Sequence, residues 1–363
     1  LWLKLSGWKG DAGLVGAVFL LCGIGLVIQF RMGSFSQGLA KPAALLPFPL
    51  GLAAFMIGTL LTGKGRGAWL ASTGWLAYLA ALGVLAAMLA LGRSFRGGTY
   101  LAGNLNPSEI VKPLLALFLA SYLSRRQKAF GETQNGIPVP PLSALLGLVV
   151  LWGIPMLMTI ALKDLGLMML LNAVLIVMLF AIARSTGYLA LGVAAVTAAG
   201  FGVQFISANA RTRFDVWLNP FADPTGKGWQ ILQALAAMYS GGLWGAGLGA
   251  GVPQSVPIVT SDFVYAAVAE EIGLVGCALL LLVYATLFSR GLRAAGAAKT
   301  PFERLLCVGL TGSLAVQTIL NVAGVTKALP MTGITLPLIS HGGSSLITTL
   351  LIAGLLTGLS DRK

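Results

Sequence analysis

Residues 263–288 read FVYAAVAEEIGLVGCALLLLVYATLF, an apolar run long enough to cross a lipid bilayer as a single helix. Directly before this run lies the longest polar stretch of the chain, residues 207–262, which opens with SANARTRFDVWLNPFADPTGKGWQ and closes with VPQSVPIVTSD. A carboxylate, Asp262, therefore stands where a long polar loop meets a membrane helix. Charge so close to a bilayer is energetically costly, and we expect it to have a functional role.

The composition defines the broad class of protein. Of the 363 residues, 57% are hydrophobic and only 10% are charged, and the mean hydropathy is +0.88, whereas about 25% of the residues of a soluble domain are charged. We expect an all-α polytopic membrane protein that forms a single integral membrane domain over residues 1–363. About ten apolar segments are long enough to be transmembrane helices, at residues 13–30, 42–61, 68–91, 107–124, 142–162, 165–183, 186–206, 263–289, 304–326 and 343–359.

Several classes of site are disfavoured by the cysteines and the histidine. Cys22, Cys277 and Cys307 all lie in apolar runs without CxxC spacing, which is typical of small apolar core residues and not of disulfides or a metal site. The single histidine, His341, excludes a His-rich metal centre. The first apolar run has no small-residue cleavage site, and we expect it to be a retained anchor.

The distribution of Lys and Arg predicts the orientation in the membrane. More of them lie in the inner loops if both termini are cytoplasmic, so the positive-inside rule favours that topology and places the 207–262 loop outside. We expect the loop to contain short interfacial or re-entrant helices. The basic residues left outside are Arg31, Lys41, Arg93, Arg96, Lys163, Arg211, Arg213, Lys227 and Lys327. A bound polyanion would explain them, and a lipid-linked phosphate or pyrophosphate is the natural candidate.

Individual charged residues allow more than one interpretation. Asp262 could be catalytic, or it could cap the helix that begins at Phe263. Lys112 could contact phosphate, or it could pair with Glu109 three residues earlier on the same helix. Lys163 and Asp164 fit either an interfacial turn or a second wall of a polar site.

Two further features bear on the site. Glu270 and Glu271 would lie inside a membrane helix and need a cationic partner, either Lys112 or a loop arginine. Residues 328–346, ALPMTGITLPLISHGGSSL, interrupt the helical pattern at membrane depth with Pro and Gly. Such backbone is tolerated only where it is buried in protein or lines a cavity. The glycine-rich residues 245–251 lack dinucleotide-binding spacing and are typical of a re-entrant turn.

Taken together, these residues resemble the SEDS family of shape, elongation, division and sporulation proteins. The resemblance covers nearly the whole chain. The blocks that carry it are NPSE at 106–109 with Lys112, DLG at 164–166, WLNPFADPTG at 217–226, SGGL at 240–243, SDF at 261–263, EEIG at 270–273, PMTG at 330–333 with LP at 336–337, and GGSS at 342–345. The sequence departs from the family pattern at His341, where the family usually has Tyr, and at residues 97–101, GGTYL, where an expected basic residue is missing and Arg93 or Arg96 could substitute.

The resemblance implies a peptidoglycan glycosyltransferase with ten transmembrane helices, which polymerises lipid II at the outer face of the bacterial cytoplasmic membrane beside a class B penicillin-binding protein. Asp262 falls at the family's essential aspartate and would act as a general base. The expected substrate-binding residues are Arg211, Arg213, Lys227, Lys112, Glu109, Arg93, Arg96, Asp164, Lys163, Ser344 and Ser345. Mg²⁺ or Mn²⁺ could assist, because both suit carboxylate and phosphate oxygens.

Two other classes of function also fit the pattern. Many helices with buried charges and broken segments are typical of transporters, so a flippase for a lipid-linked precursor is an alternative. A membrane scaffold whose loop docks cell-wall enzymes is another. We expect membrane lipids, but no nucleic acid, among the partners.

Overall fold

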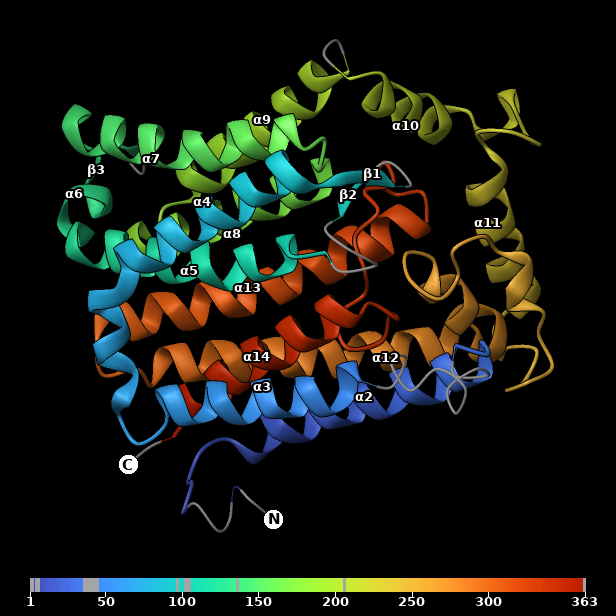
Figure 1. Cartoon of the computed structure of the whole chain (residues 1–363), viewed down its shortest axis with the longest axis horizontal. Coiled ribbons are helices and arrows are strands. Elements are labelled where there is room, and N and C mark those ends of the chain that lie inside the picture. The colour runs from blue at the N-terminus through green and yellow to red at the C-terminus, as the bar shows by residue number, and fades with distance from the viewer. Residues whose placement is uncertain are drawn as a thin grey trace.

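The computed structural model describes residues 3, 7–34, 46–95, 98–100, 106–134, 137–204 and 207–361, most of which form helices that run roughly alongside one another (Figure 1). Each of the predicted apolar segments contains a helix. These helices are α2 (Ala12–Arg31), α3 (Pro47–Thr62), α4 (Gly74–Leu91), α5 (Ser108–Arg125), α7 (Leu142–Ala161), α8 (Leu165–Ala183), α9 (Thr186–Val203), α12 (Val264–Gly296), α13 (Pro301–Val325) and α14 (Gly343–Leu359). A 3₁₀ helix, η2 (Arg66–Thr73), leads directly into α4.

The helices confirm a polytopic membrane protein. Among the described residues, six helical stretches are long and apolar enough to span a membrane: α2, η2 with α4, α7, α8, α12 and α13. Helices α3, α9 and α14 are apolar but shorter, and α5 carries Glu109 and Lys112 inside its first turns.

The fold is not entirely helical. Strand β1 (Arg93–Phe95) pairs antiparallel with β2 (Gly98–Tyr100), and β3 (Thr133–Gln134) pairs with β4 (Ile137–Pro138) after the short helix α6 (Gln127–Gly131). Both hairpins are connections between helices, so they add local structure without changing the architecture.

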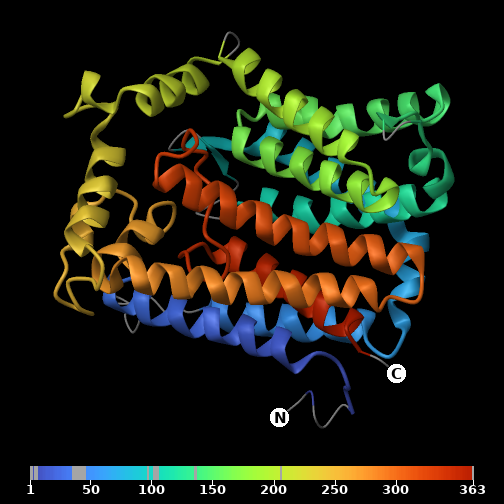
Figure 2. The ribbon, with the colours of Figure 1, turned by 180° about the vertical axis from the view of Figure 1, so that it is seen from behind.

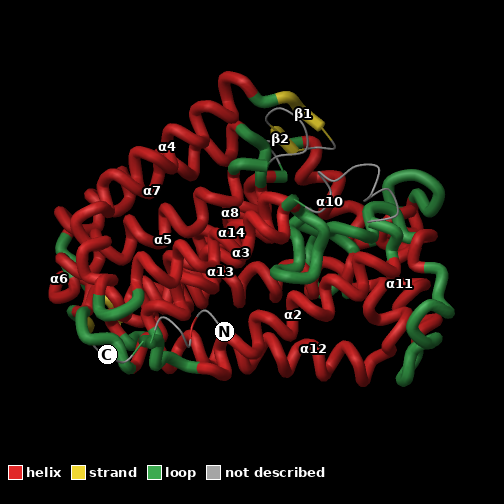
Figure 3. The backbone as a smooth tube through the Cα atoms, turned by 60° about the horizontal axis from the view of Figure 1, so that its bottom comes forward, coloured by secondary structure: helices red, strands yellow, loops and turns green. Residues whose placement is uncertain are grey.

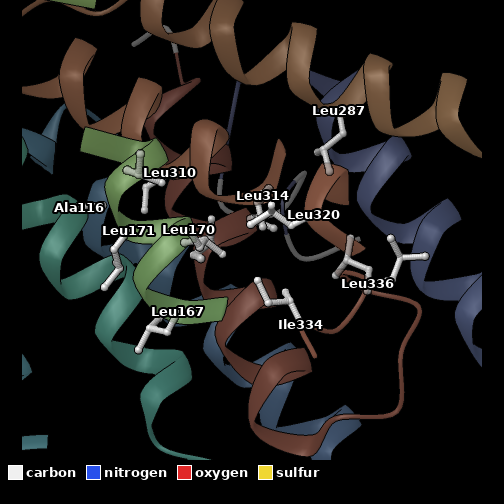
Figure 4. Packing of buried hydrophobic residues seen from close by; sticks show 14 of the residues in the cluster. Ala116, Leu167, Leu170, Leu171, Leu287, Leu310, Leu314, Leu320, Ile334 and Leu336 are labelled. Atoms are coloured by element: carbon white, nitrogen blue, oxygen red, sulfur yellow. The ribbon is translucent and has the colours of Figure 1, made fainter. Parts of the chain in front are cut away.

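Helix α13 lies at the centre of the packing and is the most buried of the long apolar helices of the described chain. Its Leu310 and Leu314 lie close to Leu170 and Leu171 of α8 in the apolar core (Figure 4). These four leucines are almost fully buried. Because lipid is as apolar as leucine, helices in a membrane associate through such close van der Waals packing.

Helices α3 and α14 approach each other through small residues. A Cβ added to Gly354 of α14 would lie 2.2 Å from the carbonyl oxygen of Phe55 on α3. The Thr59 hydroxyl donates to the Gly354 carbonyl at 3.2 Å. Small side chains and hydroxyl groups are common at helix contacts within membranes. Here they fix α14, and with it the end of the segment that joins α13 to α14.

The 207–262 loop lies at one end of the bundle, and the chain termini lie away from it (Figures 1 and 2). It contains the predicted short helices, α10 (Ala208–Leu218) and α11 (Trp229–Gly241), and the 3₁₀ turns η3 (Pro220–Ala222) and η4 (Pro253–Ser255). Helix α11 packs against α12, so the loop folds back onto the membrane helix that follows it. The tube view in Figure 3 shows how much of this end is irregular backbone.

Helix α12 is interrupted where the glycine-rich part of the loop meets it. Gly273 has φ of 65° and ψ of −173°, which is not helical. The backbone groups freed by this break bond to the loop: Ala246 N donates to the Glu270 carbonyl at 2.9 Å, and Leu274 N donates to the Gly242 carbonyl at 2.9 Å. The predicted re-entrant turn is therefore joined to α12 by hydrogen bonds between backbone groups, which satisfies polar atoms that would be costly in a membrane.

The cationic partner of Glu271 is Arg31, the last residue of α2, and is neither Lys112 nor a loop arginine as the sequence had suggested. Arg31 Nε lies 3.0 Å from Glu271 Oε1, and Arg31 Nη2 donates to the carbonyls of Gly249 and Gly251 at 3.0 and 2.9 Å. One of the outer basic residues thus has a structural role, because it joins α2, the glycine-rich loop and α12.

Candidate active site

Asp262 lies in a cleft of about 790 Å³. Its walls come from α10, the segment that leads into α11, the loop before α12, and the chain that leaves α13. The lining residues are Thr212, Arg213, Val216, Trp217, Gly226, Lys227, Trp229, Gln230, Ile231, Pro257, Ile258, Asp262, Phe263, Gly324, Lys327, Leu329, Met331 and Gly333. The cleft therefore combines one carboxylate, three cationic side chains and an aromatic and aliphatic wall.

Asp262 is held by α13 and by the segment between α13 and α14, which is the predicted helix-breaking stretch. Buried Asn321, on α13, donates from Nδ2 both to the Asp262 carbonyl at 2.9 Å and to the Ile334 carbonyl at 2.7 Å. Just upstream, Ser340 Oγ donates to the Ser261 carbonyl at 2.5 Å. The backbone at Asp262 is thus fixed from both sides. Helix α12 begins at Val264 with Phe263 as its N-cap, so Asp262 stands one residue before the capping position.

Arg213 is positioned by the same segment. Its Nη1 donates to the carbonyls of Met331 and Thr332 at 3.1 and 2.7 Å. One helical turn further along α10, Trp217 Nε1 donates to the Lys327 carbonyl at 3.1 Å. These bonds hold α10 against residues 327–332 and bring the Arg213 guanidinium to the Asp262 side of the cleft.

Gly333 explains how the two side chains fit together. It has a φ of 74°, in the left-handed region that glycine adopts without strain. A Cβ at this position would lie 3.5 Å from Arg213 Nη2 and 3.7 Å from Asp262 Oδ2. Glycine is therefore favoured at position 333 by its backbone conformation, and the two distances show that the cation and the carboxylate both lie next to it.

Lys227 lies in a turn fixed by Asp223. The Asp223 carboxylate accepts from Lys227 N at 3.0 Å, and its carbonyl accepts from Gly228 N at 2.9 Å. The Lys227 side chain is exposed and lines the cleft. Lys327, just after the end of α13, also lines the cleft. The cleft therefore carries positive charge from α10, from the turn before α11 and from the end of α13.

Lys112, Glu109, Ser344 and Ser345 do not line this cleft. Lys112 is only 4% exposed, and its Nζ lies 2.6 Å from Glu109 Oε2 and 2.9 Å from Gln317 Oε1. The structure thus favours an ion pair within α5 over a phosphate contact for Lys112.

A row of hydrogen-bonded side chains continues from Lys112 towards α14. Gln317 Nε2 donates to the Thr335 carbonyl at 3.0 Å, and the Thr335 and Ser345 hydroxyls lie 2.8 Å apart. The Ser344 hydroxyl accepts from Asn106 N at 3.4 Å. Thr335 lies two residues after Gly333, which lines the cleft. This row of hydrogen bonds therefore supports the segment that forms the cleft wall, on the side away from the cleft.

Asp164 lies between the Asp262 cleft and the buried polar residues around Lys112. It caps α8, and its Oδ1 accepts from Leu167 N at 2.9 Å. Loss of water contact raises the pKa of the Asp164 carboxyl, while the Leu167 N–H and the charges of Lys112 and Arg213 act to lower it. Asp164 therefore interacts electrostatically with Lys112 among the buried polar residues and with Arg213 in the cleft, although Asp164 does not line the cleft.

The remaining predicted residues lie elsewhere. Arg211 and Lys163 are exposed and do not line the cleft. Arg93 lies in strand β1, and Arg96 falls outside the described residues, so their substrate contacts stay a prediction. Of the departing residues 97–101, positions 98–100 form strand β2, and positions 97 and 101 fall outside the described residues.

Sequence reasoning missed Lys327, Trp217 and Asn321 as site residues. Lys327 was recognisable as one of the outer basic residues, and it directly precedes the helix-breaking segment. Trp217 stands in the family-like WLNPFADPTG block. Asn321 gave no signal, since a single Asn in an apolar helix has many structural uses.

A metal site made by the protein alone is not seen in the part of the chain that the structure describes. No group of three or more His, Cys, Asp or Glu side chains gathers there. Asp262 is the one carboxylate among the described residues of the cleft wall. A bound Mg²⁺ or Mn²⁺ would therefore need most of its oxygen ligands from substrate or water, and these residues do not by themselves fit a metal cage.

The fold and this cleft define a polytopic helical membrane protein with a charged site at one end of its bundle. A family model described as "Cell cycle protein", named for FtsW, RodA and SpoVE, matches residues 43–363. The chain therefore belongs to the FtsW/RodA/SpoVE family, and the predicted family relationship is confirmed.

Curated relatives support the assignment. The chain is 36% identical over 260 residues to peptidoglycan glycosyltransferase RodA of Mycobacterium tuberculosis, which covers 71% of this chain and 55% of the relative. It therefore spans about half the length of the mycobacterial relatives. It is also 36% identical to a probable peptidoglycan glycosyltransferase FtsW of Geobacter sulfurreducens and to stage V sporulation protein E of Bacillus subtilis, over 71% of this chain and 68% and 69% of those proteins.

Solved structures show the same fold. The chain matches a structure described as a peptidoglycan synthase complex that coordinates polymerization and crosslinking, with a TM-score of 0.73, 26% identity and coverage of 96% of this chain and 97% of that one. It also matches the rod shape determining protein RodA of Thermus thermophilus with a TM-score of 0.67, 26% identity and coverage of 98% of each chain.

Proposed function

We propose that this chain is a peptidoglycan glycosyltransferase that polymerises lipid II into glycan strands. The observation that carries the proposal is the placement of Asp262 in a cleft with Arg213, Lys227 and Lys327. The names of the relatives support the same activity. Cell elongation and cell division are both compatible with these relatives, which include RodA and FtsW proteins.

The reaction needs a base and a cationic site. A hydroxyl of the acceptor sugar attacks the anomeric carbon of the donor, a new C–O bond forms, and the bond from that carbon to the lipid pyrophosphate breaks. Asp262 accepts the hydroxyl proton as the new bond forms. The negative charge that develops on the departing pyrophosphate is stabilised by cations already in place, and Arg213, Lys227 and Lys327 supply them.

Arg213 is the best placed of these cations. Its two bonds to the Met331 and Thr332 carbonyls fix the guanidinium plane, and a guanidinium presents several further N–H donors to phosphate oxygens. Lys227 is exposed and adds a point charge to the wall of the cleft. The apolar walls formed by Trp229, Phe263 and Leu329 suit the lipid part of the substrate.

The cleft would face the outside of the bacterial cytoplasmic membrane, with both termini in the cytoplasm. The excess of Lys and Arg in the loops at the other end of the bundle supports this orientation. Lipid II presented at the outer face would then reach Asp262 from the bilayer through the end of the molecule built by the 207–262 loop.

A class B penicillin-binding protein is the proposed partner, because polymerised strands must be cross-linked. Support comes from the similarity to a peptidoglycan synthase complex. The 207–262 loop offers the partner a surface outside the membrane.

Purified protein in proteoliposomes with fluorescent lipid II tests the activity class. We expect glycan polymer that lysozyme digests. Movement of lipid II across the bilayer without polymer would show a flippase instead. The absence of both polymer and movement would favour a scaffold.

A further inference from the structure

A second cavity lies at the other end of the bundle from Asp262, where α5 ends and α4 begins. It has a volume of about 440 Å³ and is lined by Trp75, Phe118, Ser121, Tyr122, Arg125 and Arg126. We call it the α4–α5 pocket. In Figure 1 helix α5 runs from the hairpin β1–β2, near the Asp262 end, to α6 at the opposite end. None of the residues of this pocket takes part in the proposed glycosyl transfer.

The inner wall of the pocket is aromatic. The Trp75 and Phe118 ring centroids are 5.5 Å apart, and those of Phe118 and Tyr122 are 5.7 Å apart. Phe118 and Tyr122 are buried, whereas Trp75, in the first turn of α4, is 51% exposed. A half-exposed tryptophan at the end of a membrane helix is typical of the level of lipid headgroups.

The outer wall carries two guanidinium groups at the end of α5. Arg126 Cζ lies 4.2 Å from the centroid of the Tyr122 ring, a cation–π contact that fixes its position. Arg125 Nη2 donates to the Ala71 carbonyl at 3.1 Å, and the Ser121 hydroxyl donates to the same oxygen at 2.7 Å. Both arginines are therefore held at the pocket by contacts that use few of their N–H donors.

Neither arginine is neutralised by a carboxylate within the described chain. The ion pairs found there involve Arg31, Lys112 and Arg290. Two positive charges thus stand together over an aromatic wall, and each guanidinium keeps most of its five N–H groups for an external acceptor. Aromatic surface beside paired cations suits a molecule that is both anionic and apolar.

We propose that the α4–α5 pocket binds an acidic phospholipid of the leaflet at this end of the bundle, with the phosphate at Arg125 and Arg126 and the glycerol and upper acyl chain against Trp75 and Phe118. Basic pockets between membrane helices on the cytoplasmic side are known to bind acidic headgroups. A soluble phosphate would use the guanidinium groups but not the aromatic wall. The site lies outside the proposed catalytic cleft and does not depend on the proposed function.

Native mass spectrometry of the whole detergent-purified chain, titrated with phosphatidylglycerol or phosphatidylcholine, tests the proposal. We expect phosphatidylglycerol to be retained preferentially. Loss of one arginine should weaken that binding about fivefold, the equivalent of about 1 kcal/mol for one basic residue near an anionic membrane surface, so Arg125→Gln with Arg126→Gln should weaken it about 25-fold. Arg126→Lys should bind less well than wild type, because an ammonium lacks the planar donor set.

Arg293→Gln is the matched control. Arg293 is an exposed arginine in the last turn of α12 and does not line the pocket, so its loss removes the same charge while leaving the pocket intact. Binding of Arg293→Gln close to wild type supports the site. Three results would overturn the proposal: equal weakening by Arg293→Gln, equal retention of phosphatidylcholine, or displacement of the lipid by millimolar inorganic phosphate.

Discussion

The Arg213 guanidinium and the Asp262 carboxylate converge over Gly333, since a Cβ at that glycine would lie 3.5 Å from Arg213 Nη2 and 3.7 Å from Asp262 Oδ2. The cation comes from a loop helix and the carboxylate from the start of a membrane helix. The backbone between them belongs to the break between α13 and α14. The site therefore exists only when these separate parts are assembled, and each can be tested by a substitution.

Arg213→Gln should lower lipid II polymerisation about 100- to 1000-fold, the range seen when one preorganised donor to a developing charge is removed. Turnover by purified protein at saturating lipid II measures this loss. Arg211→Gln is the control, because Arg211 is on the same short helix but exposed and away from the cleft. Equal losses for both variants would contradict a specific role for Arg213.

Asn321→Ala should reduce kcat about tenfold with little change in KM. The substitution frees the carbonyls of Asp262 and Ile334 from their shared donor, so the Asp262 backbone is less well fixed. The unsatisfied buried groups should also cost roughly 1–3 kcal/mol of stability.

Thr326→Ala is the control for the loss of kcat in Asn321→Ala. The Thr326 hydroxyl lies just beyond the end of α13, and within the described chain it donates to the Val322 and Ala323 carbonyls of that helix. We expect normal kcat for this variant. An Asn321→Ala protein with wild-type kcat would show that Asn321 does not position Asp262.

Gly273→Ala should destabilise the protein by several kcal/mol. Its φ and ψ lie in a region that is essentially restricted to glycine and costs about 1–3 kcal/mol for other residues. A Cβ there would also lie 2.3 Å from Gly245 N. Gly296→Ala at the end of the same helix meets nothing within 4 Å, and its melting temperature in detergent should match that of wild type. A Gly273→Ala protein as stable as Gly296→Ala would contradict the proposed joint between loop and helix.

The proposed orientation in the membrane, with both termini in the cytoplasm, predicts a labelling pattern. In a variant lacking Cys22, Cys277 and Cys307, a cysteine replacing exposed Thr225 should react with a membrane-impermeant maleimide in intact spheroplasts. A cysteine replacing Lys299 should react only after permeabilisation. The reverse pattern would place the Asp262 cleft in the cytoplasm.

The sequence predicted the helical architecture well, because hydrophobic length is a direct signal in a membrane protein. It also placed Asp262 and Arg213 in one site. It could not separate Arg213 from Arg211, since which face of α10 meets Met331 and Thr332 depends on tertiary packing. Residues two apart on a helix lie about 200° apart around its axis, so only one of the two arginines faces the cleft.

Long-range partners were the other limit. The partner of Glu271 is Arg31, 240 positions away in the chain, and no local pattern indicates that pairing. Lys112 shows the opposite case, because its i,i+3 spacing from Glu109 indicated the ion pair that the structure contains.

Asp262→Asn tests the central claim most directly, with Asp215→Asn as its control. Asp215 is exposed on α10 and does not line the cleft. In a gel-based assay of lipid II polymerisation by the purified, folded protein, we predict glycan product from wild type and Asp215→Asn and none from Asp262→Asn. Polymer formed by Asp262→Asn at the wild-type rate would contradict the account.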